Sequence, residues 1–337
     1  MRKALWMVIA GLALLGAGRA EQKKVLVYGL SPEGIAELRQ AAPEARIVPV
    51  DRDTVMKEIA DADAIIGTIS AELVRAGKRL KWAQVPSAGV ERYLHLAPPD
   101  LRDSDIVLTN CKIIQGPEIA DHAFALLLAT TRRLPRYLAN QREQTWRRET
   151  SGLVELNGKT AVVIGVGGIG AQIAVRAKAF GMRVIGVEPK DLPYMPFLDR
   201  VVKPDRLDEV LPEADVVFMA APHTPQTHKM MGTRQFELMK RDSYFVAVSR
   251  GKTYDMDALV RALDSQHLAG AGVDVTDPEP LPAGHPLWKF SNVVITPHVA
   301  GRSDRVGRRR LDLYKENLQR FPRGEPLVNV VDKQKGY

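Results

Sequence analysis

The sequence has 337 residues, 45% of them hydrophobic and 26% charged, with a formal net charge of +8. This composition is ordinary for a globular protein, and the length suggests about two domains. The single cysteine, Cys111, excludes an intramolecular disulfide and a cysteine-based zinc site, and we predict no other metal site.

The first twenty residues have the pattern of an export signal. Arg2 and Lys3 precede an apolar run over residues 4–18, and small residues stand at the −3 and −1 positions of a cut after Ala20. We expect residues 1–20 to be a signal peptide and the mature protein to be exported or periplasmic. The run is shorter than the roughly 20 residues of a membrane span, so none is expected after cleavage. The alternative is a start codon assigned too far upstream, which would leave a cytoplasmic protein.

Short β-branched runs then alternate with helical stretches. Strands are expected over residues 24–30, 45–50, 63–69 and 80–86, with helices over 31–42 and 54–62 between the first three. This βαβ rhythm predicts a parallel sheet. Residues 23–115 should therefore form a first α/β domain, which we expect to bind the substrate.

A long apolar helix is expected over residues 117–133. It is apolar nearly all round from Ile119 to Ala129, which indicates a buried helix, and Pro117 suits its first turn. His122 lies within it, and we interpret it as a core histidine with one satisfied hydrogen bond rather than as a catalytic group.

A second βαβ series follows, with strands expected around residues 159–164, 182–189, 214–222, 243–251, 268–275 and 292–298. Residues 116–301 should form a second α/β domain. The expected fold is thus two Rossmann-like, doubly wound parallel-sheet domains with a cleft between them.

The remaining residues, 302–337, contain one amphipathic helix and are too few to form a core alone. We expect them to fold back onto the first domain. The basic cluster at residues 301–310 could bind nucleic acid, but acidic and apolar residues follow it at helical spacing without an aromatic stacking platform. We therefore interpret it as a solvated helix face and expect no nucleic-acid partner.

A glycine-rich motif between the first strand and first helix of the second series predicts a dinucleotide site. Gly165, Gly167, Gly168, Ile169 and Gly170 belong to a G-x-G-x-x-G pattern that opens a helix. The three pattern glycines permit the tight turn, the approach of the pyrophosphate and helix–strand packing, and the helix N-terminus offers N–H groups to phosphate.

The next strand ends at Glu188, whose carboxylate can accept hydrogen bonds from ribose hydroxyls and would repel a 2′-phosphate. NAD is therefore favoured over NADP as cofactor, although Lys190 close by weakens that preference.

Chemistry-bearing residues follow three later strands. Arg250 follows one, Asp274, Asp277 and Glu279 follow another, and His298 follows a third. Hydride transfer to a carbonyl needs a proton donor, which a histidine held by a carboxylate can be, and a cation for the substrate acid, which the arginine fork suits.

These motifs, SRG, DPEPLP and TPH after the glycine loop, resemble the D-2-hydroxyacid dehydrogenase family in order and spacing over residues 24–330. The resemblance implies that Arg250 binds the 2-keto acid, that Glu279 pairs with His298, and that His298 exchanges the proton at the C2 oxygen. It implies that Asp274 holds the nicotinamide carboxamide, whereas Asp277 has no implied role.

The resemblance extends to further positions. It implies that the loop of Ala88, Gly89 and Val90 clasps the substrate carboxylate, that Ala221 and Pro222 lie against adenosine, and that Val248 and Gly301 contact nicotinamide through the backbone. It also implies a homodimer formed through helix 117–133 and Trp146.

Two segments, PHTPQT and HPLW, favour the glyoxylate and hydroxypyruvate reductase branch. Tyr254 replaces the family's usual small aliphatic residue, and we expect it to pack rather than to shape the pocket. The main hypothesis is an NAD(H)-dependent reductase of small 2-keto acids. The alternatives are an NAD(H)-bound sensor or corepressor-like binding protein without turnover, and an exported protein that keeps one cofactor molecule bound.

Overall fold

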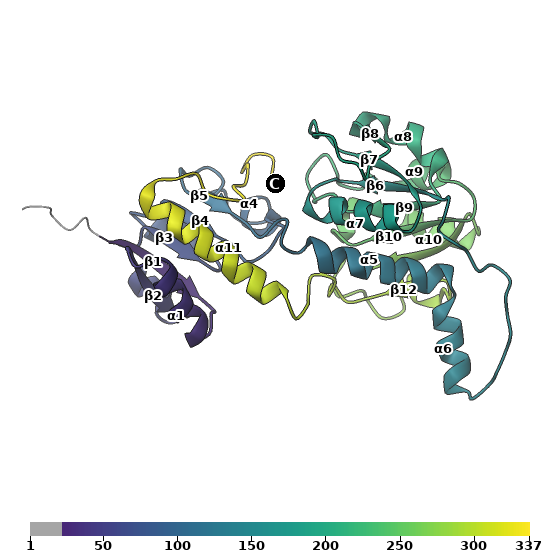
Figure 1. The fold of residues 1–337 in the computed structure, drawn as a ribbon, viewed down its shortest axis with the longest axis horizontal. Helices are drawn as coiled ribbons and strands as arrows, with labels where there is room; N and C mark the ends of the chain where they lie inside the picture. The colour runs from purple at the N-terminus through teal and green to yellow at the C-terminus, as the bar shows by residue number, and fades with distance from the viewer. Residues whose placement is uncertain (1–21) are drawn as a thin grey trace, which may run out of the picture.

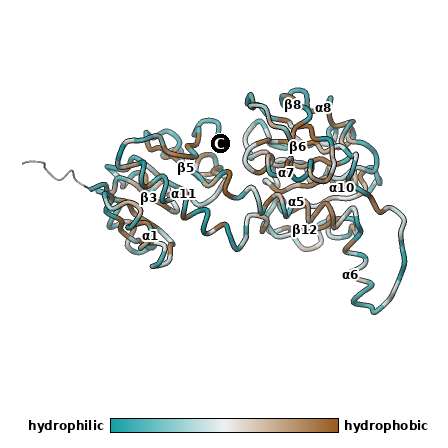
Figure 2. The backbone as a smooth tube through the Cα atoms, in the orientation of Figure 1, coloured by the Kyte–Doolittle hydropathy of each residue, from teal (hydrophilic) through white to brown (hydrophobic). Residues whose placement is uncertain are grey.

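The computed structural model describes residues 22–337, so the expected signal peptide lies outside the described residues. The chain forms two lobes, each built on one parallel sheet (Figure 1). The apolar stretches of the chain follow the strands of both sheets (Figure 2). The two doubly wound α/β domains predicted from the sequence are confirmed.

The first lobe contains a five-stranded sheet in the order β2-β1-β3-β4-β5, in which neighbouring strands pair in parallel. Its elements are β1 (Lys23–Tyr28), α1 (Pro32–Ala41), β2 (Ala45–Val50), α2 (Val55–Glu58), β3 (Ala64–Ile66), α3 (Ala71–Ala76), β4 (Trp82–Gln84), α4 (Glu91–Leu94) and β5 (Val107–Thr109).

The second lobe contains a seven-stranded parallel sheet in the order β12-β11-β10-β9-β6-β7-β8. Its helices and strands are α5 (Gly116–Thr131), α6 (Leu134–Arg142), β6 (Thr160–Ile164), α7 (Gly168–Ala179), β7 (Arg183–Val187), β8 (Arg200–Val202), α8 (Leu207–Val210), β9 (Val216–Met219), α9 (Thr233–Leu238), β10 (Ser243–Ala247), α10 (Met256–Asp264), β11 (Leu268–Val273) and β12 (Val293–Ile295). The strand order reverses between β6 and β9, which is where ligands bind in such sheets.

Helix α5 belongs to the second lobe, where it packs against α7 and β11 rather than between the lobes. Its buried residues include Ile119, Phe124, Leu126 and Leu127, so the expectation of a buried helix is confirmed.

The last helix, α11 (Val306–Arg320), returns to the first lobe and lies beside α1 (Figure 1). Its Leu313, Tyr314 and Leu318 join a core cluster of the first sheet. The buried Asn317 donates from Nδ2 to Gln84 Oε1 at 2.9 Å, which ties the helix to strand β4.

The basic cluster at the start of α11 is occupied by ion pairs within the chain. Arg308 pairs with Glu37 of α1 at 2.8 Å and with Asp312 at 2.9 Å, and Arg309 pairs with Glu118 of α5. These pairs favour the interpretation as a helix face over a nucleic-acid surface.

Helix α6 and the loop after it project from the second lobe (Figure 1). They expose the apolar side chains of Leu134, Leu138 and Trp146, and the Trp146 side chain is 96% exposed. Within residues 22–337, no helix has the length and apolarity to cross a bilayer.

Candidate active site

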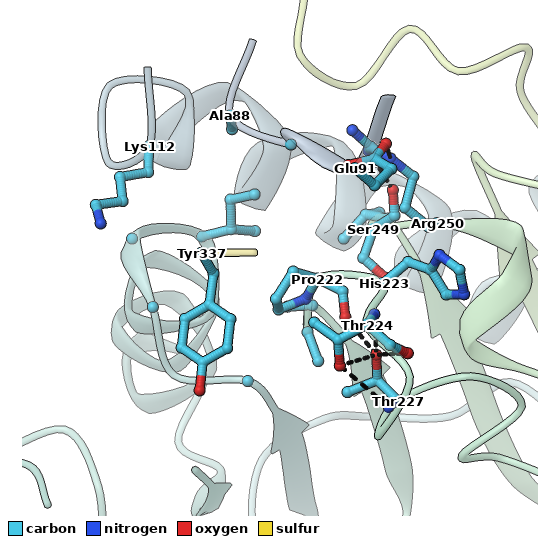
Figure 3. Close-up of a pocket in the computed structure, with 18 of the residues that line it drawn as sticks. Ala88, Glu91, Lys112, Pro222, His223, Thr224, Thr227, Ser249, Arg250 and Tyr337 are labelled. Carbon is cyan, nitrogen blue, oxygen red and sulfur yellow. Dashed lines mark hydrogen bonds and ion pairs between the residues drawn. The ribbon is translucent and has the colours of Figure 1, made fainter. Parts of the chain in front are cut away.

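A pocket with a volume of about 1410 Å³ lies between the two lobes. The second lobe contributes the glycine loop, the ends of β7, β9 and β10, and the segment after β12. The first lobe contributes the loop after β4, the crossing segment at residues 110–115, and the end of the chain. Figure 3 shows Arg250, Glu91 and His223 on one side of this pocket, with Lys112 and Tyr337 on the other.

The glycine loop lies at the switch in strand order. Gly165 has φ of +86°, and a Cβ there would lie 2.6 Å from the Cα of Ala221, which follows the neighbouring strand β9. A Cβ on Gly170 would collide with the carbonyl oxygen of Gly165, so this glycine permits helix–strand packing. A Cβ on Gly167 would meet no atom within 4 Å, which leaves its backbone open to a ligand in the pocket.

Gly168 and Ile169 also line the pocket, but Gly168 has a second contact. A Cβ on Gly168 would lie 2.5 Å from the Cα of Ile113, in the segment that joins the two lobes. Gly168 therefore permits close approach of the lobes beside the glycine loop, a requirement that the motif alone did not indicate.

Glu188 follows β7 and lies at the pocket wall. Its Oε2 accepts a hydrogen bond from the Val166 amide at 2.9 Å, and its Oε1 accepts one from the Lys190 amide at 3.2 Å. A carboxylate offers about four acceptor positions, so the side chain can brace the glycine loop and still accept from a ribose hydroxyl.

His298 and Glu279 form a hydrogen-bonded pair, with 2.8 Å between His298 Nδ1 and Glu279 Oε2. Both side chains are partly exposed, and His298 lines the pocket whereas Glu279 does not. The pairing of Nδ1 leaves Nε2 of His298 for a substrate.

His298 has φ of +53°, a conformation that non-glycine residues seldom adopt. Its backbone amide donates to the Asp274 carbonyl at 2.8 Å. The Asp274 carboxylate accepts from Thr296 Oγ1 at 2.6 Å and from the amides of Val299 and Ala300, both at 2.9 Å. Asp274 thus lines the pocket and also fixes the loop that carries the histidine.

Arg250 follows β10 and reaches across to the first lobe. Its Nε donates to Glu91 Oε1 at 2.6 Å, and its Nη1 donates to the Ser249 carbonyl at 2.7 Å. Burial alone would raise the pKa of Glu91, but the charge of Arg250 and its hydrogen bond outweigh burial and hold that pKa below its usual range. A Cβ on Gly89 would collide with Arg250 Nη2, so the guanidinium occupies the space that this glycine leaves free.

The other expected site residues divide into two groups. Val90 is 1% exposed and packs in the first-lobe core, without lining the pocket. The remaining expected residues all line the pocket: Ala88, Gly89, Ala221, Pro222, Val248 and Gly301.

His122 and Tyr254, for which we expected a structural rather than a functional role, do not line the pocket. His122 bonds through Nε2 to Thr296 Oγ1 at 2.8 Å, which confirms a hydrogen-bonded histidine, although its side chain is half-buried rather than fully in the core. Tyr254 is 1% exposed and donates to the Val275 carbonyl at 2.7 Å, so its expected packing role is confirmed.

Several polar pocket residues were not predicted from the sequence, among them Glu91, His223 and Tyr337. Glu91 lies beside the loop that we expected to bind the substrate carboxylate. It was not predicted as a site residue, because a negatively charged side chain does not indicate an anion-binding site. His223 Nε2 lies 3.1 Å from His228 Nδ1, and burial together with the charges of His228 and Lys252 lowers the pKa of His223. Tyr337, at the other end of the pocket, had no motif around it.

A dinucleotide fits the residues present. The open backbone at Gly167, the start of α7 and the carboxylate of Glu188 line the same pocket as His298 and Arg250. No group of three or more potential metal ligands occurs within residues 22–337.

Comparison with known families agrees with this geometry. Residues 124–300 match the model of the "D-isomer specific 2-hydroxyacid dehydrogenase, NAD binding domain", which covers more than half of the chain. The chain belongs to the D-isomer specific 2-hydroxyacid dehydrogenase family.

The similarity to known proteins covers most of the length of this chain and of the proteins compared. A glyoxylate reductase of Korarchaeum cryptofilum is 33% identical over 297 residues, which cover 85% of this chain and 87% of the relative. The crystal structure of the TT0316 protein from Thermus thermophilus is 34% identical and has a TM-score of 0.73, covering 91% of this chain and 99% of that one.

A further similar structure was solved with a bound cofactor. The NADPH-dependent glyoxylate/hydroxypyruvate reductase from Sinorhizobium meliloti, solved in complex with NADP and sulfate, is 25% identical with a TM-score of 0.79. The similarity covers 94% of this chain and 100% of that one. The 2-hydroxyacid dehydrogenase fold and an NAD(P)-binding domain are therefore established for the present chain.

Proposed function

We propose that this protein is an NAD(H)-dependent reductase of small 2-keto acids, with glyoxylate or hydroxypyruvate as substrate. The observation that carries the proposal is that Arg250 and His298 line one pocket with the glycine loop, and that Glu279 hydrogen-bonds to His298 from outside that pocket. A carboxylate-binding cation and an oriented proton donor are the two groups that reduction of a 2-keto acid needs from the protein.

In this proposal Arg250 binds the carboxylate of the keto acid, and Gly89 leaves space for the guanidinium and the substrate. His298 donates a proton from Nε2 to the C2 oxygen as negative charge develops there, and Glu279 keeps the imidazole oriented and stabilises its charged form. The bound dinucleotide supplies the hydride to C2. In the reverse direction His298 would accept the proton of the C2 hydroxyl of a D-2-hydroxy acid, while oxidised NAD, when bound, would take the hydride from C2.

NAD is the proposed cofactor in preference to NADP. Glu188 supports this choice, because a carboxylate at the end of β7 would repel a 2′-phosphate. Lys190 opposes it, because its ammonium would attract a 2′-phosphate. Two similar structures were also solved in complex with NADPH and with NADP.

The test is a panel of 2-keto acids with NADH and NADPH, using protein without residues 1–20. NADH oxidation with glyoxylate or hydroxypyruvate supports the proposal. Tight NADH binding without turnover of any keto acid would instead support a dinucleotide sensor. Release of nucleotide on denaturing the purified protein would support a permanently bound cofactor.

We further propose a homodimer formed through the α5–α6 region. The exposed Leu134, Leu138 and Trp146 support it, since apolar side chains clustered on a projecting segment favour a protein contact. Sedimentation should give twice the monomer mass, and Trp146→Ala should shift the protein toward monomer. Arg147→Ala, next to it, is the matched control.

Export is proposed from the leader alone. Cell fractionation with N-terminal sequencing tests it: a start at Glu21 in an exported fraction supports a cleaved signal peptide. A cytosolic protein that starts near Gln22 or Lys23 would support a misassigned start codon, and it would also remove the need for a cofactor supply outside the cytosol.

A further inference from the structure

The last six residues form a compact turn that is fastened to the first lobe. Asp332 organises it, because Asp332 Oδ1 accepts from the amides of Gln334 and Lys335, both at 3.1 Å, and its carbonyl accepts from the Gly336 amide at 2.8 Å. Lys333 donates from Nζ to the carbonyls of Leu101 at 3.1 Å and Ile106 at 3.0 Å. The turn is therefore held in one place.

This turn reaches the pocket. Gln334, Lys335 and Tyr337 line it. Gly336 has φ of +79°, and a Cβ there would lie 2.5 Å from His95 Nε2, so the chain bends closely over the first lobe just before Tyr337.

The Tyr337 ring contacts the second lobe across the pocket. Lys190 Nζ lies 4.4 Å from the ring centroid, within the range of a cation–π contact. Lys190 is two residues beyond Glu188, so the ring lies at the end of the pocket where that carboxylate would meet ribose. Figure 3 shows Tyr337 and Lys112 together on the side away from Arg250.

Positive charge gathers at the same end. Burial and the charge of Lys190 lower the pKa of Lys112, whose Nζ also donates to the Val330 carbonyl at 3.0 Å. An aromatic face with one ammonium group against it, in a pocket that a second ammonium also lines, suits an aromatic base joined to phosphates.

We propose that Tyr337 forms one wall of the adenosine end of the pocket and covers the adenine or its ribose when a dinucleotide binds. The cofactor is then held from both lobes, by Glu188 on the second and by Tyr337 on the first. The inference rests on the proposed dinucleotide use of this pocket, although it does not depend on turnover of any substrate.

The test measures binding of NADH and of ADP-ribose, which lacks the nicotinamide, by titration calorimetry. Tyr337→Ala should weaken both by about tenfold, as loss of an aromatic stacking face does. Tyr337→Phe keeps the ring and should stay within about twofold of the parent. Tyr194→Ala is the matched control, because Tyr194 is 89% exposed and does not line the pocket.

Unchanged ADP-ribose binding by Tyr337→Ala would overturn the inference, and equal losses in the alanine and phenylalanine variants would overturn the role of the ring. Failure of the parent to turn over any keto acid would contradict the proposed reductase but leave this binding test intact. In steady-state kinetics the same loss should appear as a raised KM for NADH in Tyr337→Ala and not in Tyr337→Phe.

Discussion

Arg250 and Glu91 form an ion pair that joins the two lobes inside the pocket, with 2.6 Å between Arg250 Nε and Glu91 Oε1. The guanidinium that should hold the substrate acid therefore already has a carboxylate partner. A substrate carboxylate would share the fork with Glu91 and would feel its negative charge. Glu91 thus fixes the position of Arg250 and at the same time weakens its attraction for an anion.

These two roles can be separated by substitution. Glu91→Gln keeps an oxygen that accepts from Arg250 but removes the charge, so we expect KM for the keto acid to fall by about three- to tenfold, with kcat little changed. Glu91→Ala removes the support as well and should lower kcat. Steady-state kinetics measure both, with exposed Glu72→Gln as control, and an unchanged KM in Glu91→Gln would contradict the competition.

The pH dependence of this effect follows from the lowered pKa of Glu91. Its ordinary value is 4.5, and the Arg250 charge holds it lower despite burial, so the carboxylate stays ionised at every pH above 4.5. We expect the ratio of KM between parent and Glu91→Gln to stay constant above that pH. The ion pair's contribution to stability should be lost only as pH falls below 4.5 through the folded-state pKa. A ratio that changed near neutral pH would point to another group.

Loss of the proton donor should abolish most of the turnover. His298→Ala is expected to lower kcat by about 10²- to 10⁴-fold with NADH binding unchanged, because the imidazole acts on the substrate oxygen. Glu279→Gln should have a smaller effect, since the amide oxygen can still accept from Nδ1. Stopped-flow NADH oxidation measures these rates, and His267→Gln, away from the pocket, is the control. Normal turnover by His298→Ala would refute the assignment.

Substitutions at two glycines of the loop should separate an effect on cofactor binding from an effect on stability. Gly167 has φ of −76° and free space where a Cβ would stand, so Gly167→Ala should fold normally. It should weaken NADH binding by about tenfold or more, because the methyl group occupies the approach of the pyrophosphate. Gly170→Ala should instead destabilise the protein by about 3 kcal/mol, since its methyl group collides with the Gly165 carbonyl. Thermal melts and NADH titrations distinguish the two, and an equal loss of stability in both would contradict this division.

The sequence predicted those parts of the site that follow strands. Gly165 and Arg250 follow the buried apolar strands β6 and β10, and His298 follows the partly buried apolar strand β12. Parallel strands bring their carboxyl ends to one edge, so the meeting of these residues follows from the pattern. The short edge strands β5 and β8 have three residues each and too little pattern to be found.

The residues that were missed depend on how the lobes meet. Glu91 reaches Arg250, 159 positions later in the chain, and Tyr337 reaches Lys190 across the pocket. No local periodicity encodes such contacts, because they are set by the angle between two separately formed sheets. Val90 is the opposite case, because it was predicted to bind substrate but does not line the pocket. Its apolar side chain packs in the core, whereas the residues on either side of it line the pocket.

Cofactor choice should be decided between Glu188 and Lys190. The carboxylate repels a 2′-phosphate and the ammonium attracts it, but the carboxylate is braced by the Val166 and Lys190 amides and so cannot swing away readily. We therefore expect the parent to prefer NADH. Glu188→Gln, which retains an acceptor for Val166, should raise kcat/KM for NADPH relative to NADH by about tenfold, equivalent to about 1.4 kcal/mol. Lys190→Ala should lower the efficiency with NADPH more than with NADH. A parent enzyme that uses both cofactors equally, with no change of ratio in Glu188→Gln, would show that the carboxylate only braces the loop.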